Sequence, residues 1–283
     1  MPRTQIVPEE LTKLYHITGD EACTGQEKWL VIGITVISDE HVDHVRAKFL
    51  AMKKMLGLPD EVKWVKCTHK NLPRYKRLAN VILYLIERDI INFHSIAIFK
   101  AVVDNEKYNE GIPEIGFNKF VYHLLRKWAR RYPAERKYLV QLDERTSNVP
   151  IDTLTHCLNF GVMRDYKLDH FPFRRTRYAN SKSDVLFEIN DLLVGAVGFE
   201  MNRKHKPPVK SVIKAELAKH IRKGSGLWRF GISSGPQHKR FTTWRFEFND
   251  LPGKKSRRAP RKKKIGARGP RPRKVRASPS PQD

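Results

Sequence analysis

Cysteine is scarce in this sequence, with only Cys23, Cys67 and Cys157 among 283 residues. The number is odd and no two cysteines have Cys-x-x-Cys spacing, which argues against a disulfide framework and against a ribbon-type zinc site. His69 follows Cys67 closely and His156 precedes Cys157, so a mixed Cys/His metal site is the alternative to small buried thiols. The cysteine usage fits a reducing compartment.

Long apolar runs are also missing. The first ten residues, MPRTQIVPEE, contain no apolar stretch of the kind that directs secretion. No run of about 18 consecutive apolar residues occurs anywhere in the chain. The sequence therefore predicts a cytoplasmic protein that is neither exported nor embedded in a membrane.

Acidic residues are few beside the basic ones: 30 Asp and Glu stand against 55 Lys and Arg, for a net charge of +25. The segment from Gly253 onward holds 13 of the basic residues and one acid, so the remainder still carries +13. A positive charge of this size points to a polyanionic partner, and nucleic acid is the first candidate.

Apolar periodicity predicts an α/β protein with one large domain over residues 8–250. Hairpin and crossover connections both occur in the expected order of elements, so we expect a mixed sheet flanked by helices. The expected strands cover residues 11–18, 28–38, 94–103, 137–143, 171–178 and 242–248, and the expected helices cover 38–57, 72–86, 117–128, 151–166 and 183–200, with one further short helix before the last strand.

The last 31 residues, 253–283, contain Lys, Arg, Pro, Ser and Gly and almost nothing that could be buried. Such a segment is predicted to be disordered when free. Its basic side chains suit non-specific phosphate binding through counterion release, although a nuclear address would look the same. The residues expected to contact nucleic acid here are Lys254, Lys255, Arg257, Arg258, Arg261, Lys262, Lys263 and Lys264.

Two aspartates follow apolar strands. Asp20 comes just past the end of the first expected strand, and Asp143 ends the strand KYLVQLD. If these strands are parallel neighbours, the two carboxylates meet at one edge of the sheet, where open α/β sheets place their sites. Carboxylates that close require a cation or a shared proton, and oxygen ligands favour Mg2+ or Mn2+.

Asp191 supplies a third acid from the helix over residues 183–200. It lies off the apolar stripe of that helix and shares a face with Asp184, Glu188, Gly195 and Gly198. The small half of this face is expected to let another backbone come close. Each acid could instead be a cap, a turn residue or a solvated charge, but phosphodiester chemistry with paired metals uses several carboxylates that converge from different elements.

Four short motifs resemble a ribonuclease H-like family, the domain of unknown function 3800. They are GDEA at residues 19–22, EVKW at 61–64, LDER at 142–145 and EINDLLVGA at 188–196, in the family's order and spacing. The resemblance covers about residues 11–200. It implies that the expected mixed sheet flanked by helices is a ribonuclease H-like fold. It also implies a metal site formed by Asp20, Asp143 and Asp191, and it adds Glu61 as a fourth acid.

The sequence departs from the family pattern at two places. Ala22 and Cys23 stand where the family has Ser-Gly, and EIND at residues 188–191 replaces Gln-x-Ala-Asp. Both changes spare the aspartates, so they affect substrate fit and helix packing rather than the metal ligands. The alternative for Glu61 is a solvated charge before an edge strand.

Basic residues near these motifs are candidates for phosphate contacts. Lys63, with Lys66 beside it, could neutralise charge on a metal-bound phosphate, whereas the alternative is that Lys63 pairs with a nearby acid and Trp64 belongs to the core. The basic strand candidate FPFRRTRY holds Arg174, Arg175 and Arg177, which could follow a phosphate backbone or could merely protect an edge strand from aggregation.

Three functions are consistent with the sequence. The leading hypothesis is a magnesium-dependent nuclease in which Asp20 and Asp143 bridge the ions, Glu61 and Asp191 complete the shell, and water attacks the phosphorus. A non-catalytic nucleic-acid-binding or adaptor protein on the same fold is the first alternative. A strand-transfer factor related to transposition or integration is the second, which the lack of a separate DNA-binding domain disfavours.

Overall fold

The computed structural model describes residues 13–59, 61–130, 136–145, 149–204, 206 and 210–248. The described residues up to Glu247 belong to one compact unit. The expected domain limits at 8 and 250, and the basic tail with its eight candidate phosphate contacts, lie outside the described residues. No helix of the described part is both long and apolar enough to cross a membrane.

A six-stranded sheet organises this unit, with strand order β5-β4-β1-β2-β3-β6 among the described residues. The pairs β1–β2 and β2–β3 are antiparallel, whereas β1–β4, β4–β5 and β3–β6 are parallel. The mixed sheet expected from the sequence is therefore confirmed. The strands are β1 (Leu14–Ala22), β2 (Trp29–Ser38), β3 (Ile91–Phe99), β4 (Lys137–Asp143), β5 (Phe173–Ala179) and β6 (Phe241–Arg245).

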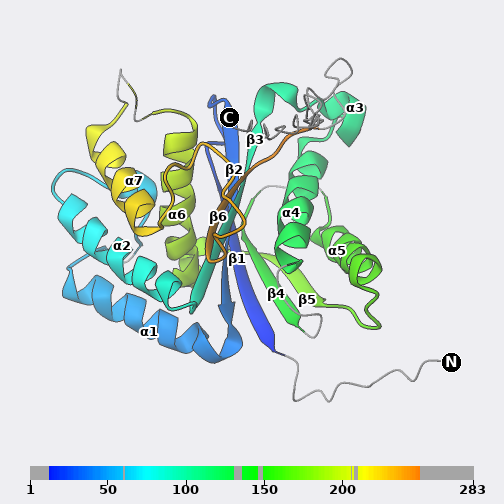
Figure 1. Cartoon of the computed structure of the whole chain (residues 1–283), viewed down its shortest axis with the longest axis horizontal. Coiled ribbons are helices and arrows are strands. Elements are labelled where there is room, and N and C mark those ends of the chain that lie inside the picture. Colours follow the sequence, from blue (N-terminus) through cyan, green and yellow to red (C-terminus); the bar gives the residue numbers. More distant parts are fainter. Residues whose placement is uncertain are drawn as a thin grey trace, which may run out of the picture. The chain divides into compact units, whose positions relative to one another are not determined.

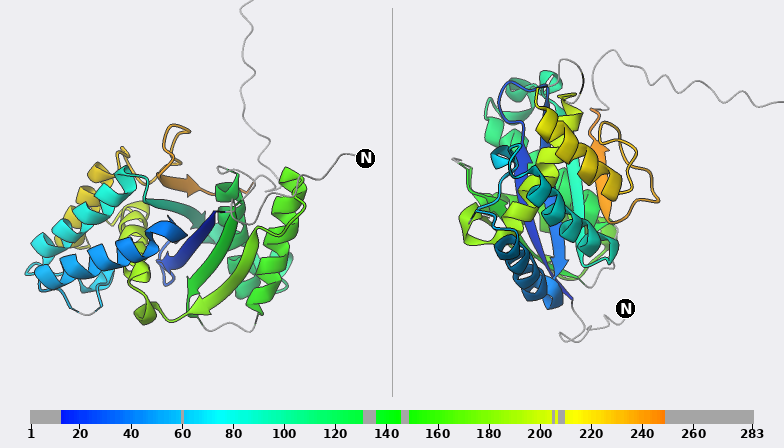
Figure 2. Two further views of the ribbon diagram at one scale, coloured as in Figure 1. Left: turned by 90° about the horizontal axis from the view of Figure 1, so that it is seen from below. Right: turned by 90° about the vertical axis from the view of Figure 1, so that its left-hand side faces the viewer.

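Helices cover both faces of the sheet (Figures 1 and 2). Because both faces are covered, β2 is buried along almost its whole length and reads as a continuous apolar run. One face carries α1 (Asp39–Met55), α2 (Leu72–Glu87), α6 (Val185–Met201) and α7 (Val212–Gly224). The other carries α3 (Asn105–Asn109), α4 (Pro113–Ala129) and α5 (Ile151–Tyr166).

Three single turns of 3-10 helix complete the described elements, namely η2 (Trp64–Lys66), η3 (Lys100–Val102) and η4 (Ser181–Ser183). The expected strand 94–103 is displaced, since β3 starts at Ile91 to pair with β2 and the chain turns into η3 after Phe99. Short α3, capped by the Asp104 carboxylate, lies in a segment that its turn-forming residues marked only as a loop.

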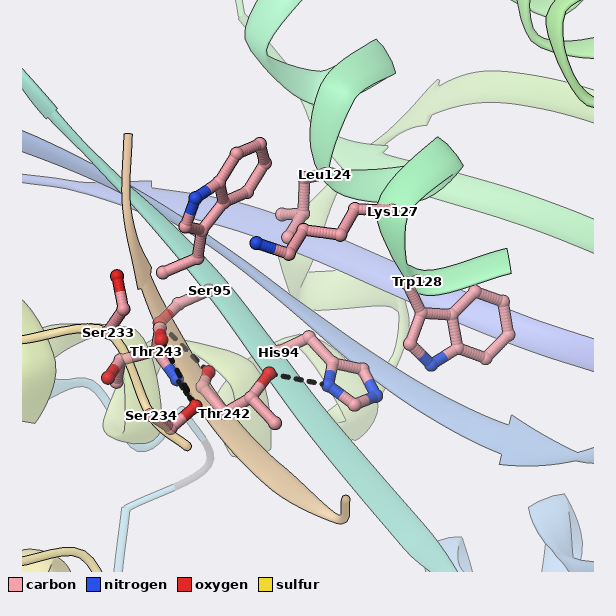
Figure 3. Close-up of a pocket in the computed structure, with 10 residues that line it drawn as sticks. His94, Ser95, Leu124, Lys127, Trp128, Ser233, Ser234, Thr242 and Thr243 are labelled. Atoms are coloured by element: carbon pink, nitrogen blue, oxygen red, sulfur yellow. Dashed lines mark hydrogen bonds between the residues drawn. The ribbon is translucent and has the colours of Figure 1, made fainter. Parts of the chain in front are cut away.

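The short strand β6 is attached to β3 by polar contacts as well as by the ladder. The Thr242 hydroxyl lies 2.8 Å from Nδ1 of buried His94, and the Ser95 hydroxyl donates to the Thr242 carbonyl oxygen at 3.3 Å (Figure 3). These contacts surround a cavity of about 40 Å³ beneath α4. Buried polar groups paired in this way hold the strand in one register.

Candidate metal-binding carboxylate site

Asp20 and Asp143 lie on neighbouring parallel strands. In the β1–β4 ladder Gly19 pairs with Leu142, so the two aspartates are the next residues on each strand. The parallel arrangement expected from the sequence is confirmed. The expected end of the first strand is wrong, however, because β1 continues to Ala22 through its pairing with β2 and Asp20 lies within it, opposite Gly33.

Asn190 positions the third aspartate. Its side chain is fully buried, accepts a hydrogen bond from the Thr35 hydroxyl at 3.0 Å and donates to the Gly33 carbonyl oxygen at 3.1 Å. Gly33 is the partner of Asp20 in the β1–β2 ladder. The amide therefore ties α6 to β2 at the level of Asp20, and the next residue on the helix is Asp191. Sequence reasoning missed Asn190, whose only signal is a polar side chain inside an apolar helix.

Each of the three carboxylates accepts a hydrogen bond from a backbone N–H. Asp20 and Asp143 both use Oδ1 to accept from the following residue, at 2.7 and 2.8 Å. Asp191 accepts from the N–H of Trp64 at 2.5 Å. These bonds orient all three side chains, and the one to Trp64 also holds the segment before η2 against α6.

The three carboxylates influence one another electrostatically. Burial raises the pKa of Asp20 to about 8, and the charges of Asp191 and Asp143 add to the effect. Burial also raises the pKa of Asp191, to about 6. The Trp64 N–H and the charge of Lys63 oppose this shift, and the charge of Asp143 adds to it. Such a cluster is stabilised either by a retained proton or by a bound cation.

Glu61 is held by two lysines. The Nζ atoms of Lys66 and Lys63 lie 2.8 and 3.1 Å from its two carboxylate oxygens, and these contacts, that of Lys66 foremost, lower its pKa. Glu61 raises the pKa of Asp191 slightly but is not among the groups that act on Asp20. No edge strand follows it; the chain forms η2 instead, and Trp64 is buried.

Lys63 is the cation that faces the aspartates. Burial by itself lowers the pKa of this lysine, but Glu61, and then Asp191 and Asp143, raise it above its ordinary value. Lys63 thus pairs with a nearby acid, Glu61, and also interacts electrostatically with Asp191 and Asp143.

Glu21 and Arg145 form an ion pair beside the cluster. Their closest atoms are 3.6 Å apart, and the guanidinium also lies 3.6 Å from the centre of the Phe117 ring. Burial raises the pKa of Glu21, and Arg145 opposes that shift. The sequence alone did not predict this pair, although Glu21 directly follows Asp20 and Arg145 lies two residues after Asp143.

The other acids of α6 have structural roles. Glu188 forms a buried ion pair with Lys53 at 2.7 Å and accepts the N–H of Val62 at 3.0 Å. Asp184 caps the helix through the N–H of Leu186 and pairs with Arg46 at 2.5 Å. The acidic half of the helix face therefore contributes only Asp191 to the cluster.

The small half of α6 is packed against side chains rather than another backbone, namely Trp64 of η2 and Cys23, which follows β1. A Cβ atom at Gly195 would lie 2.4 Å from Cγ of Trp64, and one at Gly198 would lie 2.9 Å from Sγ of Cys23. Cys23 has a φ angle of 67°, the left-handed region that glycine adopts most readily. Glycine is the residue that the resembled family has at this position.

Two pockets meet at Glu21. One of about 360 Å³ is also lined by Asp191, and the other, of about 230 Å³, is also lined by Arg145. The candidate contacts Arg174, Arg175 and Arg177 are placed elsewhere, exposed on β5 at an edge of the described sheet.

The donor set of the cluster fits magnesium or manganese in kind, since every side-chain ligand would be a carboxylate oxygen. As the side chains stand, no three or more His, Cys, Asp or Glu residues of the described chain are gathered closely enough to hold a metal ion. Each of the three aspartates is instead bonded to a backbone N–H. Binding a cation would require the carboxylates to turn toward one another.

The sheet order, with an antiparallel β1-β2-β3 meander joined through β1 to parallel β4 and β5, defines a ribonuclease H-like α/β fold. The crystal structure of Bst-RNase HIII in complex with Mn2+ is similar over 77% of this chain, with 17% sequence identity and a TM-score of 0.37. The chain spans 64% of the length of that protein. No family model matches the sequence, and no curated protein shows significant sequence similarity.

The raised pKa of Asp20 predicts a pH-dependent stability. The unfolded chain releases the proton near pH 4, whereas the folded chain keeps it up to about pH 8, so the stability that this group contributes is complete below pH 4 and is lost as the pH rises to 8. Asp20→Asn should remove this loss. We expect the melting temperature of the variant to exceed that of the wild type by roughly 5 °C at pH 8 and to match it at pH 4.

Thermal melting across this pH range measures the effect. Asp43→Asn is the matched control, because the Asp43 side chain is 97% exposed and its charge is solvated. An equal change in the two variants at pH 8 would contradict the burial of the Asp20 charge.

Proposed function

We propose that this chain is a metal-dependent nuclease that cleaves phosphodiester bonds of DNA or RNA. The observation that carries the proposal is the convergence of three carboxylates, Asp20, Asp143 and Asp191, from two parallel strands and one helix, where the charges of Asp191 and Asp143 add to the raised pKa of Asp20. Nucleic acid as the substrate is supported by the net charge of +25.

Asp20, Asp143 and Asp191 would hold the cation, with Glu61 beside them. When bound, Mg2+ or Mn2+ would polarise the phosphate and make water a stronger nucleophile at neutral pH. Asp20 would give up its proton on metal binding, because the charge of a cation would stabilise the carboxylate against the burial, and the neighbouring acids, that raise its pKa. Lys63 would add positive charge where negative charge develops on the phosphate.

The test is cleavage of labelled single-stranded, duplex and hybrid nucleic acids by the purified protein, with Mg2+, with Mn2+ and with a chelator. We expect at least one substrate to be cut only when a divalent cation is present. Cleavage that resists chelation, or no cleavage of any substrate under these conditions, would contradict the proposal.

A non-catalytic nucleic-acid-binding protein is the second candidate. It is favoured by the present side-chain positions, in which each aspartate is satisfied by a backbone N–H and Glu61 by two lysines. Nucleic-acid binding that is equal with and without divalent cations, and that leaves the substrate intact, would support this candidate instead.

Removal of residues 253–283 should weaken nucleic-acid binding. The segment carries 13 Lys and Arg. The logarithm of the binding constant falls linearly with the logarithm of the salt concentration, and each phosphate contact on a duplex makes this slope steeper by about 0.9. We expect weaker binding and a flatter salt dependence, measured by titration at several salt concentrations, with an unchanged melting temperature. An unchanged slope would show that the segment does not contact phosphate.

The chain would then be a divergent member of the family that its motifs resemble. The left-handed backbone at Cys23, where that family has glycine, supports the assignment.

A further inference from the structure

The pocket beside Asp191 is amphipathic. Its volume of about 360 Å³ falls in the range of small-ligand sites. Apolar side chains and the lysines Lys204, Lys210 and Lys214 line the same space as Asp191. We refer to it as the lysine pocket; its apolar lining includes Ala22, Trp64 and Phe199.

The apolar part of the lysine pocket is rigidly supported. Trp64 and Phe199 are both buried, with ring centroids 5.9 Å apart, and Gly195 provides the space that the indole occupies. The Trp64 N–H is bonded to Asp191, so this surface is fixed relative to the carboxylate cluster. A flat apolar ligand would meet a preformed surface there.

The lysines differ in their partners. Lys204 is paired with Glu27 at 2.6 Å. Among the described residues, no carboxylate lies within ion-pair distance of Lys210 or Lys214. Two ammonium groups are thus available to an anion that enters the pocket next to Asp191.

We infer that the lysine pocket binds one unpaired nucleotide of the substrate, with the base against the apolar lining and a phosphate on Lys210 and Lys214. This inference rests on the proposed function and narrows its substrate class. A base can enter such a pocket only when it is unstacked and unpaired, so the substrate would be a single strand, a loop or an end rather than a continuous duplex.

Binding of single-stranded oligonucleotides that carry 2-aminopurine at one position tests the inference, with Ca2+ in place of Mg2+. Scanning the probe along the strand should give a large fluorescence change at one position only, and an abasic site at that position should weaken binding about tenfold. Uniform responses at all positions would overturn the inference.

Lys214→Ala and Lys219→Ala form a matched pair on α7. Lys219 is exposed and lies outside the pocket. We expect Lys214→Ala to weaken binding severalfold and to reduce the slope against log salt by about 0.7, and Lys219→Ala to leave the slope unchanged. Equal effects of both substitutions would also overturn the inference.

These measurements separate the inference from the proposed nuclease activity. A position-specific signal without cleavage in Mg2+ would support the pocket and contradict the nuclease. Cleavage in Mg2+ together with uniform probe responses would support the nuclease and contradict the pocket.

Discussion

Asp143→Asn is expected to lower the cleavage rate by roughly a thousandfold, because a metal ligand supports several kcal/mol of charge stabilisation in the transition state. The substitution keeps the shape of the side chain and the position that follows Leu142 in the β1–β4 ladder. It also removes one of the charges that raise the pKa of Asp20. In metal-free buffer the variant should therefore melt slightly above the wild type.

Magnesium should distinguish the two proteins further. A cation that binds only the folded state raises stability with its concentration, so the wild type should gain more from added Mg2+ than the variant. Melting curves with and without Mg2+, beside a cleavage assay, measure both effects. Glu144→Gln is the control, because Glu144 is exposed and its substitution removes one negative charge, as Asp143→Asn does. Equal magnesium shifts for Asp143→Asn and the wild type would show that Asp143 holds no metal.

Lys53→Met should destabilise the fold by about 3–5 kcal/mol, because it leaves the Glu188 carboxylate buried without its cation. Burial already raises the pKa of Glu188 against the opposing effect of Lys53. Loss of the lysine would raise that pKa further, so the penalty should be largest at high pH and should shrink as the pH falls and Glu188 takes up a proton. Denaturant unfolding of the variant and the wild type at neutral and at acidic pH measures this change in the free energy of unfolding.

The double variant Lys53→Met/Glu188→Gln is the control for this prediction. Glutamine removes the charge and keeps an oxygen that can accept the N–H of Val62, so most of the lost stability should return. A single variant that costs less than about 1 kcal/mol, or a double variant no more stable than the single one, would contradict the prediction. Since Val62 lies in the segment that leads to Trp64, loss of the ion pair should also disturb Asp191.

The placement of Asp20 beside Asp143 could be predicted from the sequence because both residues come at the end of an apolar run, and parallel pairing brings equivalent positions of two strands together. The extent of the first strand could not. Residues 19–22 read as a turn by composition, yet pairing with the apolar strand β2 extends β1 through them. Tertiary pairing here overrides local preference.

The partners of the site residues were harder to predict than the residues themselves. The lysines that hold Glu61 lie two and five residues along the chain, and only the 3-10 turn η2 brings both to one carboxylate. Asn190 bonds to groups on β2 that are more than 150 residues away in sequence. Contacts of this kind depend on how α6 packs on the sheet. Apolar periodicity predicts which face of the helix is buried, but it does not predict which residues of the sheet that face contacts.

The two neighbours of β1 lie at very different distances along the chain, so we expect them to pair with it at different times. A short connection joins β1 to β2, whereas β4 follows more than a hundred residues later. Pairing across so long a loop is slow, because the entropy of closing it is lost before the contacts form. We therefore expect Asp20 to meet the charges of Asp191 and Asp143 only in the late steps that pack α6 on the sheet and dock β4 against β1.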